Sequence, residues 1–229
     1  MTNIKFDPKS LAQYIDHTLL RPDATESEIT KLCDEALTYH FKTVCVEAKW
    51  LPVATLRLKG SKVLPITVIS FPHGSDSTEK KHQDTLWAVK NGAKEIDVVL
   101  NRQLLREKKY AEVWQDLHQV VLAAGNLPVK VILETSELNE DEKKIACSLV
   151  KAAGAHFVKT STGFSKSGAT ESDIRLMRQT VGEGFGVKAS GGIRSYEDAI
   201  KMISAGATRL GTSASIAIVQ GAGSATGAY

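Results

Sequence analysis

Two lysines, Lys159 and Lys188, are the side chains of this sequence best suited to covalent chemistry. Each stands near the end of a short apolar segment that we expect to be a buried strand, and a loop of Ser, Thr and Gly residues follows each one. A buried lysine needs a partner or a function. On adjacent strands about 4.8 Å apart, two inward amines would approach within about 6 Å. At an effective dielectric near 20 they would repel each other by about 2.8 kcal/mol, or about two pKa units.

Burial lowers the pKa of a lysine further, so we expect one of the two amines to be neutral near pH 7. A neutral amine can attack a carbonyl carbon and form a Schiff base, whose protonated form accepts electrons from an adjacent bond. The sequence therefore favours one lysine as a nucleophile and the other as the charge that lowers its pKa.

A carboxylate is expected to face the same interior. Side chains alternate along a strand, so an inward Lys159 implies an inward Phe157, and an inward Lys188 implies an inward Ser190. The same alternation turns Asp97 inward from the segment 95–100. One alternative is an internal salt-bridge cluster without a catalytic role. The position of all three residues near strand C-termini favours catalysis, because barrel active sites lie there.

Alternating helices and strands indicate the fold that would bring these residues together. The segment 25–40 has one apolar face and begins with a capping box formed by Thr25 and Glu28. Three helical segments end in Gly-Ala, at Gly92, Gly154 and Gly206, and pass directly into apolar runs. At about 28 residues per βα unit, the 229 residues hold about eight units, as in a (β/α)8 barrel.

We therefore predict an α/β fold with one TIM barrel domain over residues 1–229, with a short N-terminal helix and a flexible C-terminal tail at 220–229. Its strands are expected to begin near Ile15, Thr43, Val63, Glu95, Val129, Phe157, Gly186 and Arg209. A doubly wound open sheet is the alternative, but the G-x-G-x-x-G sequence typical of its first turn is absent.

Two loops indicate a phosphate site. The segments 190–194 and 211–213 follow the last two expected strands and contain the Gly and Ser residues that bind phosphate through backbone N–H groups and hydroxyls. Each turn is a weak signal by itself. Their place beside two inward lysines makes the pair a strong one.

The composition excludes several other classes of protein. The three cysteines are far apart and no His/Cys cluster has metal-ligand spacing, so we expect neither disulfides nor a metal site. The net charge of +3 is spread without a basic stripe, which argues against a nucleic-acid partner. No apolar run is long enough to span a membrane and the N-terminus has no signal-peptide pattern, so we expect a cytoplasmic protein.

Eight segments, in order "IDHTLL", "TVCV", "FPHG", "EIDVVLN", "VKVILET", "FVKTSTGF", "VKASGGIR" and "LGTS", together resemble the deoxyribose-phosphate aldolase family over nearly the whole chain. The resemblance implies a class I aldolase that needs no metal or other cofactor. Its reaction is the reversible cleavage of 2-deoxy-D-ribose 5-phosphate to D-glyceraldehyde 3-phosphate and acetaldehyde. It also implies a homodimer.

The resemblance assigns roles to individual residues. Lys159 would form the Schiff base, Lys188 would lower its pKa, and Asp97 would transfer protons through a bound water. Asp16 would belong to the same relay, although an N-cap or a salt-bridge partner is an equally good interpretation of it. The substrate and its phosphate would be bound by Thr160, Gly163, Ser190, Gly191, Gly192, Gly211 and Ser213.

Some positions depart from the family pattern or need separate interpretation. Phe164 and Ala214 replace a lysine and a serine found in some members, so phosphate would depend more on backbone donors. Cys45 is interpreted as a small core residue rather than a reactive thiol, and His17 as structural. Tyr229, at the end of the tail, would reach the active site and assist proton movement at the imine.

Three other functions stay open. A different Schiff-base barrel enzyme would keep Lys159 without needing Lys188, and a phosphate-binding isomerase would use the two loops without an imine. A catalytically silent barrel would serve only as a binding or scaffold module.

Overall fold

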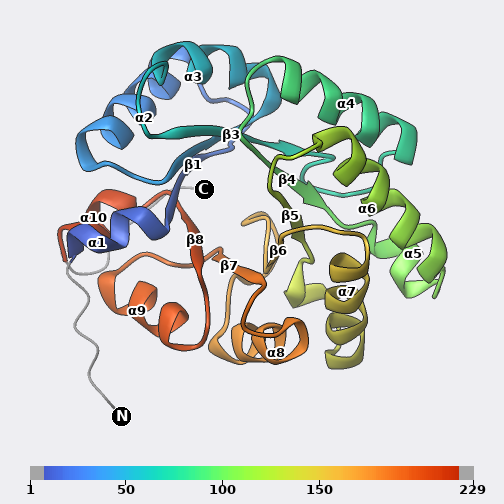
Figure 1. Cartoon of the computed structure of the whole chain (residues 1–229). Coiled ribbons are helices and arrows are strands. Elements are labelled where there is room, and N and C mark those ends of the chain that lie inside the picture. The colour runs from blue at the N-terminus through green and yellow to red at the C-terminus, as the bar shows by residue number, and fades with distance from the viewer. Residues whose placement is uncertain (1–7, 222–229) are drawn as a thin grey trace.

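Eight parallel strands close into a barrel in the computed structural model, which describes residues 8–221 (Figure 1). Each strand pairs with the next, and β8 pairs with β1. The strands are β1 (Ile15–Leu19), β2 (Thr43–Val46), β3 (Leu64–Ile69), β4 (Glu95–Val99), β5 (Val129–Ile132), β6 (Phe157–Lys159), β7 (Gly186–Ser190) and β8 (Arg209–Thr212). The predicted barrel is confirmed, and only β3 begins one residue later than expected.

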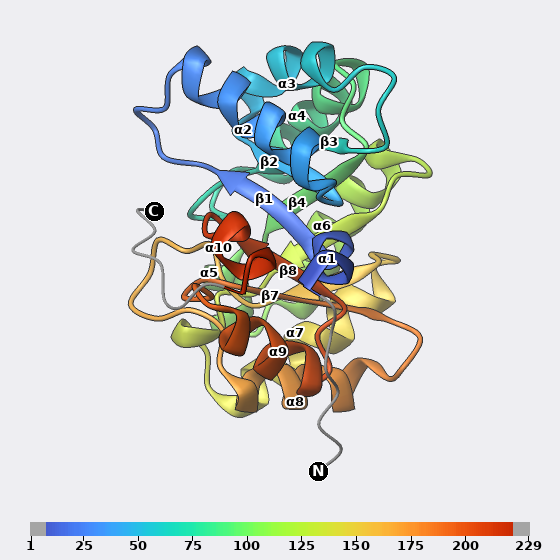
Figure 2. The ribbon, with the colours of Figure 1, turned by 90° about the vertical axis from the view of Figure 1, so that its left-hand side faces the viewer.

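Helices surround the barrel in a ring (Figure 1). The α-helices are α1 (Pro8–Leu11), α2 (Glu26–Tyr39), α3 (Leu51–Arg57), α4 (Thr78–Lys90), α5 (Arg102–Arg106), α6 (Tyr110–Ala124), α7 (Glu140–Ala152), α8 (Glu171–Val181), α9 (Tyr196–Ser204) and α10 (Ser215–Val219). Short 3-10 helices are η1 (Ala12–Tyr14), η2 (Ala48–Trp50) and η3 (Thr135–Glu137). In Figure 2 the arrowhead of β1 points to the left, so the C-terminal ends of the strands lie on that side.

The predicted helix boundaries follow from local chemistry. Thr25 accepts a hydrogen bond from the Glu28 backbone N–H, and the Glu28 carboxylate accepts one from Thr25, so the capping box of α2 is confirmed. Gly92, Gly154 and Gly206 have φ values of 97°, 85° and 116°. Glycine alone adopts this left-handed region without strain, which lets each helix turn directly into the next strand.

Apolar side chains fill the layer between the strands and the helices. Outward strand residues such as Val44, Val98, Val158 and Leu210 are fully buried there. Inside the barrel, the side nearest β2 and β3 is apolar, with Cys45, Ile66 and Val68 packed together. The other strands turn charged residues inward, so the barrel interior has an apolar side and a larger ionic side.

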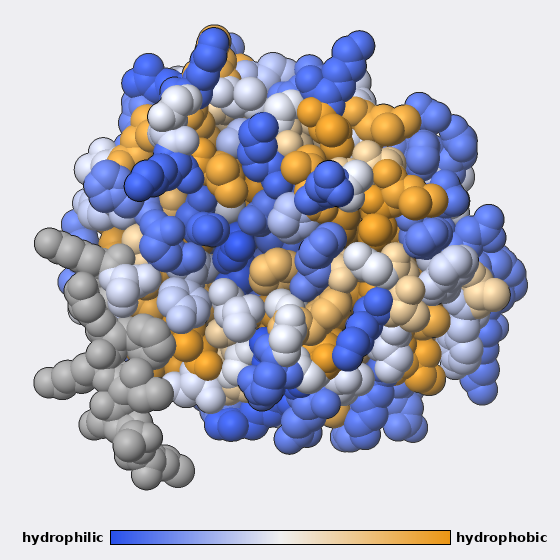
Figure 3. Space-filling model, viewed as in Figure 1, coloured by the Kyte–Doolittle hydropathy of each residue, from blue (hydrophilic) through white to orange (hydrophobic). Residues whose placement is uncertain are grey.

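The outer surface is mostly polar, with apolar residues concentrated on a few outer helices. The exposed large apolar side chains on α3, α4 and α6 are Leu56, Leu86, Trp87, Trp114 and Leu122. Figure 3 shows a group of apolar residues over α4 and α6 on the face viewed in Figure 1. Within residues 8–221, no helix combines the length and apolar character needed to cross a bilayer.

Gly186 makes room for an aromatic ring inside the barrel. It pairs with Phe157 across β6 and β7, and a Cβ at Gly186 would lie only 2.2 Å from the ring carbon Cδ1 of Phe157. That ring in turn lies beside Lys130 and Arg209, with their cationic groups 5.9 and 5.4 Å from its centroid. A side chain at position 186 would therefore displace a ring that helps to order the charged interior.

We expect Gly186→Ala to lower the free energy of unfolding by about 2 kcal/mol, the usual cost of overpacking a filled interior. Gly184→Ala is the matched control, because nothing lies within 4 Å of its would-be Cβ, and its stability should stay within about 1 kcal/mol of the original. Urea unfolding of both variants measures the difference. Equal stabilities would contradict the steric role of Gly186.

Candidate active site

The carboxylate of Asp97, on β4, binds three lysines inside the barrel. Lys159 and Lys188 each donate to Oδ2 at 2.8 Å, and Lys130 donates to Oδ1 at 2.8 Å. The four side chains are at most 3% exposed. Because Lys159 and Lys188 contact the same oxygen, their nitrogens are at most twice that distance apart. The structure thus brings together the three residues that alternation turned inward.

Asp16 belongs to the same cluster. Its carboxylate accepts hydrogen bonds from Lys188 Nζ, from Arg209 Nη1 at 2.8 Å and from the Thr43 hydroxyl at 2.8 Å. The interpretation of Asp16 as a salt-bridge partner therefore holds, whereas the N-cap of α2 is Thr25. Asp16 reaches Asp97 through a shared lysine, Lys188, which is the connection that a proton relay would need.

Lys159 and Lys188 have pKa values shifted in opposite directions. Burial is the main cause that lowers the pKa of Lys159, Asp97 opposes it, and the charge of Lys188 lowers it further. Burial also acts on Lys188, but Asp16 and Asp97 outweigh it and raise the pKa of Lys188. Burial contributes more to the lowered pKa of Lys159 than the repulsion between the two amines does.

The pKa of Asp97 lies well below its ordinary value. Burial by itself would raise this pKa, but the charges of Lys130, Lys159 and Lys188 together lower it. Asp97 is therefore charged near neutral pH.

Sequence reasoning missed Lys130 and Arg209, which lie deeper in the barrel. Lys130 contacts Glu95 Oε2 at 2.5 Å, and Arg209 Nη1 contacts the same oxygen at 2.9 Å. Alternation was a usable signal for both residues. Val129 and Val131, on either side of Lys130, face outward, just as Val158 does before Lys159. Arg209 pairs with Lys188, which faces inward.

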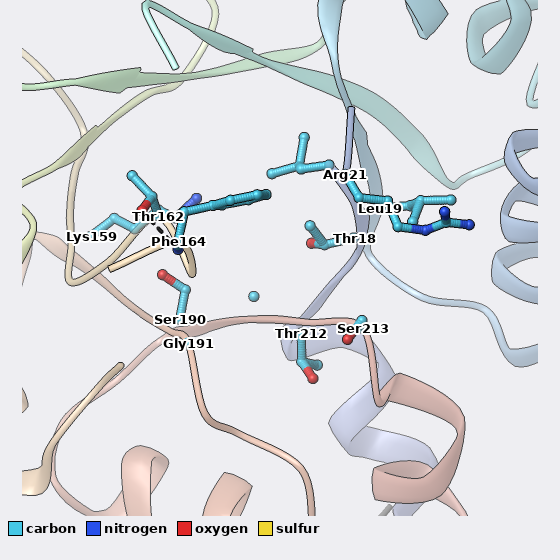
Figure 4. Close-up of a pocket in the computed structure, with 12 residues that line it drawn as sticks. Thr18, Leu19, Arg21, Lys159, Thr162, Phe164, Ser190, Gly191, Thr212 and Ser213 are labelled. Carbon is cyan, nitrogen blue, oxygen red and sulfur yellow. Dashed lines mark hydrogen bonds between the residues drawn. The ribbon is translucent and has the colours of Figure 1, made fainter. Parts of the chain in front are cut away.

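A pocket opens above the cluster at the C-terminal ends of the strands. In Figure 4, Lys159 and Thr162 lie on one side of it, Thr18 and Leu19 on the other, and Ser190 and Thr212 along a third. The lining residues are Thr18, Leu19, Leu20, Arg21, Lys159, Thr162, Phe164, Ser190, Gly191, Gly211, Thr212 and Ser213. Lys159 is the member of the charged cluster that lines this pocket.

Most of the predicted phosphate-binding residues surround the pocket. Ser190, Gly191, Gly211 and Ser213 line it together with Lys159. Gly163, Gly191 and Gly192 have φ values of 92°, 84° and 78°, the left-handed region that lets consecutive backbone N–H groups turn toward one side. Gly211 has a further role, because a Cβ there would lie 2.9 Å from Cε of Lys188.

Thr160 does not line the pocket. Its hydroxyl donates to the Ser190 carbonyl oxygen at 3.0 Å and accepts from the Ser190 backbone N–H at 3.0 Å. The side chain is fully buried. The Thr160 hydroxyl is thus engaged both as a donor and as an acceptor. Thr160 therefore links the end of β6 to β7 instead of facing a ligand.

Glu134 holds the loop that follows Lys159. It has a left-handed backbone with φ 59°, and its Oε2 accepts from the backbone N–H and the hydroxyl of Thr162, at 3.2 and 2.5 Å. The sequence contains no pattern that indicates this role. Since Thr162 lines the pocket, Glu134 fixes the shape of one wall.

The remaining candidates have structural surroundings. Burial raises the pKa of the Cys45 thiol to about 11, which agrees with a core residue rather than a reactive thiol. The His17 ring contacts Ser215 Oγ at 2.8 Å and Glu35 Oε2 at 3.0 Å, outside the pocket. Phe164 lies at the pocket edge, 43% exposed, with its ring edge-on to Phe71. Tyr229 lies outside the described residues.

No group of three or more His, Cys, Asp and Glu side chains within residues 8–221 has a geometry that would hold a metal ion. The carboxylates of the interior instead contact lysine and arginine.

Known proteins resemble this chain along almost its whole length. A deoxyribose-phosphate aldolase from Carboxydothermus hydrogenoformans is 54% identical over 215 residues, 92% of this chain and 94% of the relative. The corresponding protein from Halalkalibacterium halodurans is 53% identical, over 93% of this chain and 96% of its own.

The fold of solved aldolases matches as well. The structure of a tetrameric deoxyribose phosphate aldolase from Aeropyrum pernix superimposes with a TM-score of 0.87 at 33% identity, covering 93% of this chain and 91% of the other. The family described as DeoC/LacD family aldolase matches residues 10–227. The chain therefore belongs to the DeoC/LacD aldolase family.

Proposed function

We propose that this protein is a deoxyribose-phosphate aldolase, a class I lyase that cleaves 2-deoxy-D-ribose 5-phosphate reversibly to D-glyceraldehyde 3-phosphate and acetaldehyde. The observation that carries the proposal is a buried lysine with a lowered pKa, Lys159, at the base of a pocket and in contact with Asp97. Two relatives that are 54% and 53% identical to this chain are named deoxyribose-phosphate aldolase, which supports the same activity.

In the proposed reaction the free amine of Lys159 attacks the aldehyde carbon C1, and loss of water gives a protonated imine. Removal of the proton from the C3 hydroxyl then breaks the C2–C3 bond. The fragment that contains C3, C4 and C5 leaves as glyceraldehyde 3-phosphate. The electron pair of the broken bond moves into the imine and forms an enamine. Protonation at C2 and hydrolysis of the imine release acetaldehyde and restore the amine.

Asp97, Lys188 and Asp16 are the proposed proton carriers. Lys188 and Asp97 lie within hydrogen-bond distance of each other, and Asp97 also contacts the nucleophile. The raised pKa of Lys188 keeps it an ammonium group, able to donate a proton and to lower the proton affinity of Lys159. Asp16 would return a proton to Lys188, which it contacts directly.

The phosphate is proposed to lie between the loops after β6, β7 and β8. Gly163, Gly191 and Gly192 would offer backbone N–H groups, and Ser213 would offer a hydroxyl. The Ser190 hydroxyl already donates to the Ser161 carbonyl oxygen at 2.6 Å, so Ser190 would line the site without donating to the phosphate. Phe164 contributes an apolar ring to the pocket where a lysine would have added a charge. Binding of the phosphate would thus depend mainly on neutral donors.

Other features remain part of the proposal. Tyr229, in the tail at 220–229 of the single barrel domain, would assist proton movement at the imine. The protein would act as a cytoplasmic homodimer, and the apolar residues exposed on α3, α4 and α6 support association through outer helices.

We expect borohydride reduction in the presence of acetaldehyde to leave an ethyl group on Lys159, detected by peptide mass spectrometry. Lys159→Leu should give no adduct and lose cleavage activity by at least about 10⁴-fold while staying folded, because the covalent step is lost. A phosphate-binding isomerase or a catalytically silent barrel would form no adduct, so the absence of an adduct on Lys159 would reject the proposal.

Lys188→Leu should move the acid limb of the pH–rate profile upward by about one to two pH units. Lys159 must be unprotonated to react, and the ammonium of Lys188 lowers its pKa, so removing that charge lets Lys159 keep its proton to higher pH. Steady-state cleavage measured between pH 5 and 10 provides the comparison. An unshifted acid limb would assign the lowered pKa of Lys159 to burial alone.

Ser213→Ala should raise KM for deoxyribose 5-phosphate by about tenfold, the value of one hydrogen bond to a charged group. Cleavage of unphosphorylated deoxyribose is the internal control and should not change. Equal effects on both substrates would remove Ser213 from the phosphate site.

A further inference from the structure

Seven charged side chains form one connected network inside the barrel. Three are carboxylates, namely Asp16, Glu95 and Asp97, and four are basic, namely Lys130, Lys159, Lys188 and Arg209. Their side chains are between 0 and 8% exposed. Each one contacts an oppositely charged member of the network, so the charge state of one member affects all the others.

The network has an upper and a lower layer. The lower layer, which we define as Glu95, Lys130 and Arg209, lies on the side of Asp97 away from the pocket, with the Phe157 ring beside both cations. Lys130 binds Oδ1 of Asp97, whereas Lys159 binds Oδ2. One carboxylate thus separates Lys130 from the nucleophile, and no residue of the lower layer lines the pocket.

The charges balance only when one of the three lysines is neutral. Three carboxylates are matched by Lys130, Lys188 and Arg209, which leaves Lys159 in excess if it is an ammonium. An uncompensated charge in such an interior is costly, and the group that can lose a proton does so. Lys159 is the member of the network that lines the pocket, so it is the one that can exchange its proton with solvent.

We propose that the lower layer sets the protonation state of the nucleophile. The positive charge of Lys130 neutralises the carboxylates without a proton on Lys159, and the negative charge of Glu95 makes that proton less unfavourable. This inference rests on the proposed function, because it assumes that Lys159 reacts as a free amine. It makes Lys130 and Glu95 positioning residues that act through Asp97 without touching the substrate.

The surroundings of both lysines agree with this proposal. Asp97, Asp16 and Glu95 outweigh burial and raise the pKa of Lys130, so Lys130 keeps its charge, with Lys188 as the opposing cation. Lys159 faces Asp97, Lys188 and the thiol of Cys45. The pKa of Cys45 is raised to about 11, so it adds no charge near neutral pH.

The test uses substitutions that remove one charge from each side of the balance. In Lys130→Met the remaining charges balance with Lys159 protonated, so the acid limb of imine formation should move upward by about one pH unit. In Glu95→Gln a cation is left in excess, and the limb should move downward by about half a unit. The double variant should return close to the original profile.

Imine formation is measured directly by reductive trapping with acetaldehyde and cyanoborohydride between pH 5 and 10, with the adduct on Lys159 quantified by mass spectrometry. Lys81→Met is the matched control. Lys81 is also fully buried and bonded to a carboxylate, Asp116, but it joins α4 to α6 outside the barrel. It should lose stability without any shift of the pH profile.

Opposite shifts in the two single variants, with recovery in the double variant, support the proposal. An unshifted Lys130→Met profile, or shifts in the same direction, overturns it. Should Lys130→Met fail to fold, Glu95→Gln decides, because an unchanged or raised acid limb there also overturns the proposal. An original protein that forms no adduct at any pH rejects the proposed function itself, which separates the two failures.

Discussion

Three lysine amino groups bind the two oxygens of one buried carboxylate, Asp97, and the rest of the site depends on this arrangement. A buried carboxylate and three buried lysines would each be costly alone. Together they are stable only if the positive charges are matched by Asp16 and Glu95 and the surplus proton is absent. In the proposed function, the cost of burying a further positive charge keeps Lys159 as a free amine.

The barrel provides the geometry that this arrangement requires. Parallel strands in register place Asp97 beside Lys130 and Lys159 beside Lys188, while the alternate residues pack against the helices. Two glycines make room for the large side chains, Gly186 for Phe157 and Gly211 for Lys188. The loops after the strands form the pocket walls above the cluster, and hydrogen bonds of residues such as Thr160 and Glu134 hold them in place.

Much of this arrangement could be predicted from the sequence because it depends on local patterns. The Gly-Ala turns and the alternation within strands indicated the barrel and the inward positions of Asp97, Lys159 and Lys188. The contacts that closure of the barrel creates could not be predicted from neighbours in sequence. Closure brings Asp16 to Lys188 and Arg209, which follow it by 172 and 193 residues. The bonds of Thr160 and the left-handed backbone of Glu134 likewise depend on how loops pack in three dimensions.

Direct titration of the lysines tests the central claim, that the buried charges keep Lys159 unprotonated while its neighbours stay charged. With lysine labelled with ¹³C at Cε, nuclear magnetic resonance can follow each amine in the free protein, and the signal missing from Lys159→Leu assigns the nucleophile. We predict that Lys159 loses its proton below the ordinary lysine value of 10.5, and before Lys130 and Lys188 do. Titration of Lys159 at or above 10.5, or after either neighbour, would contradict the account.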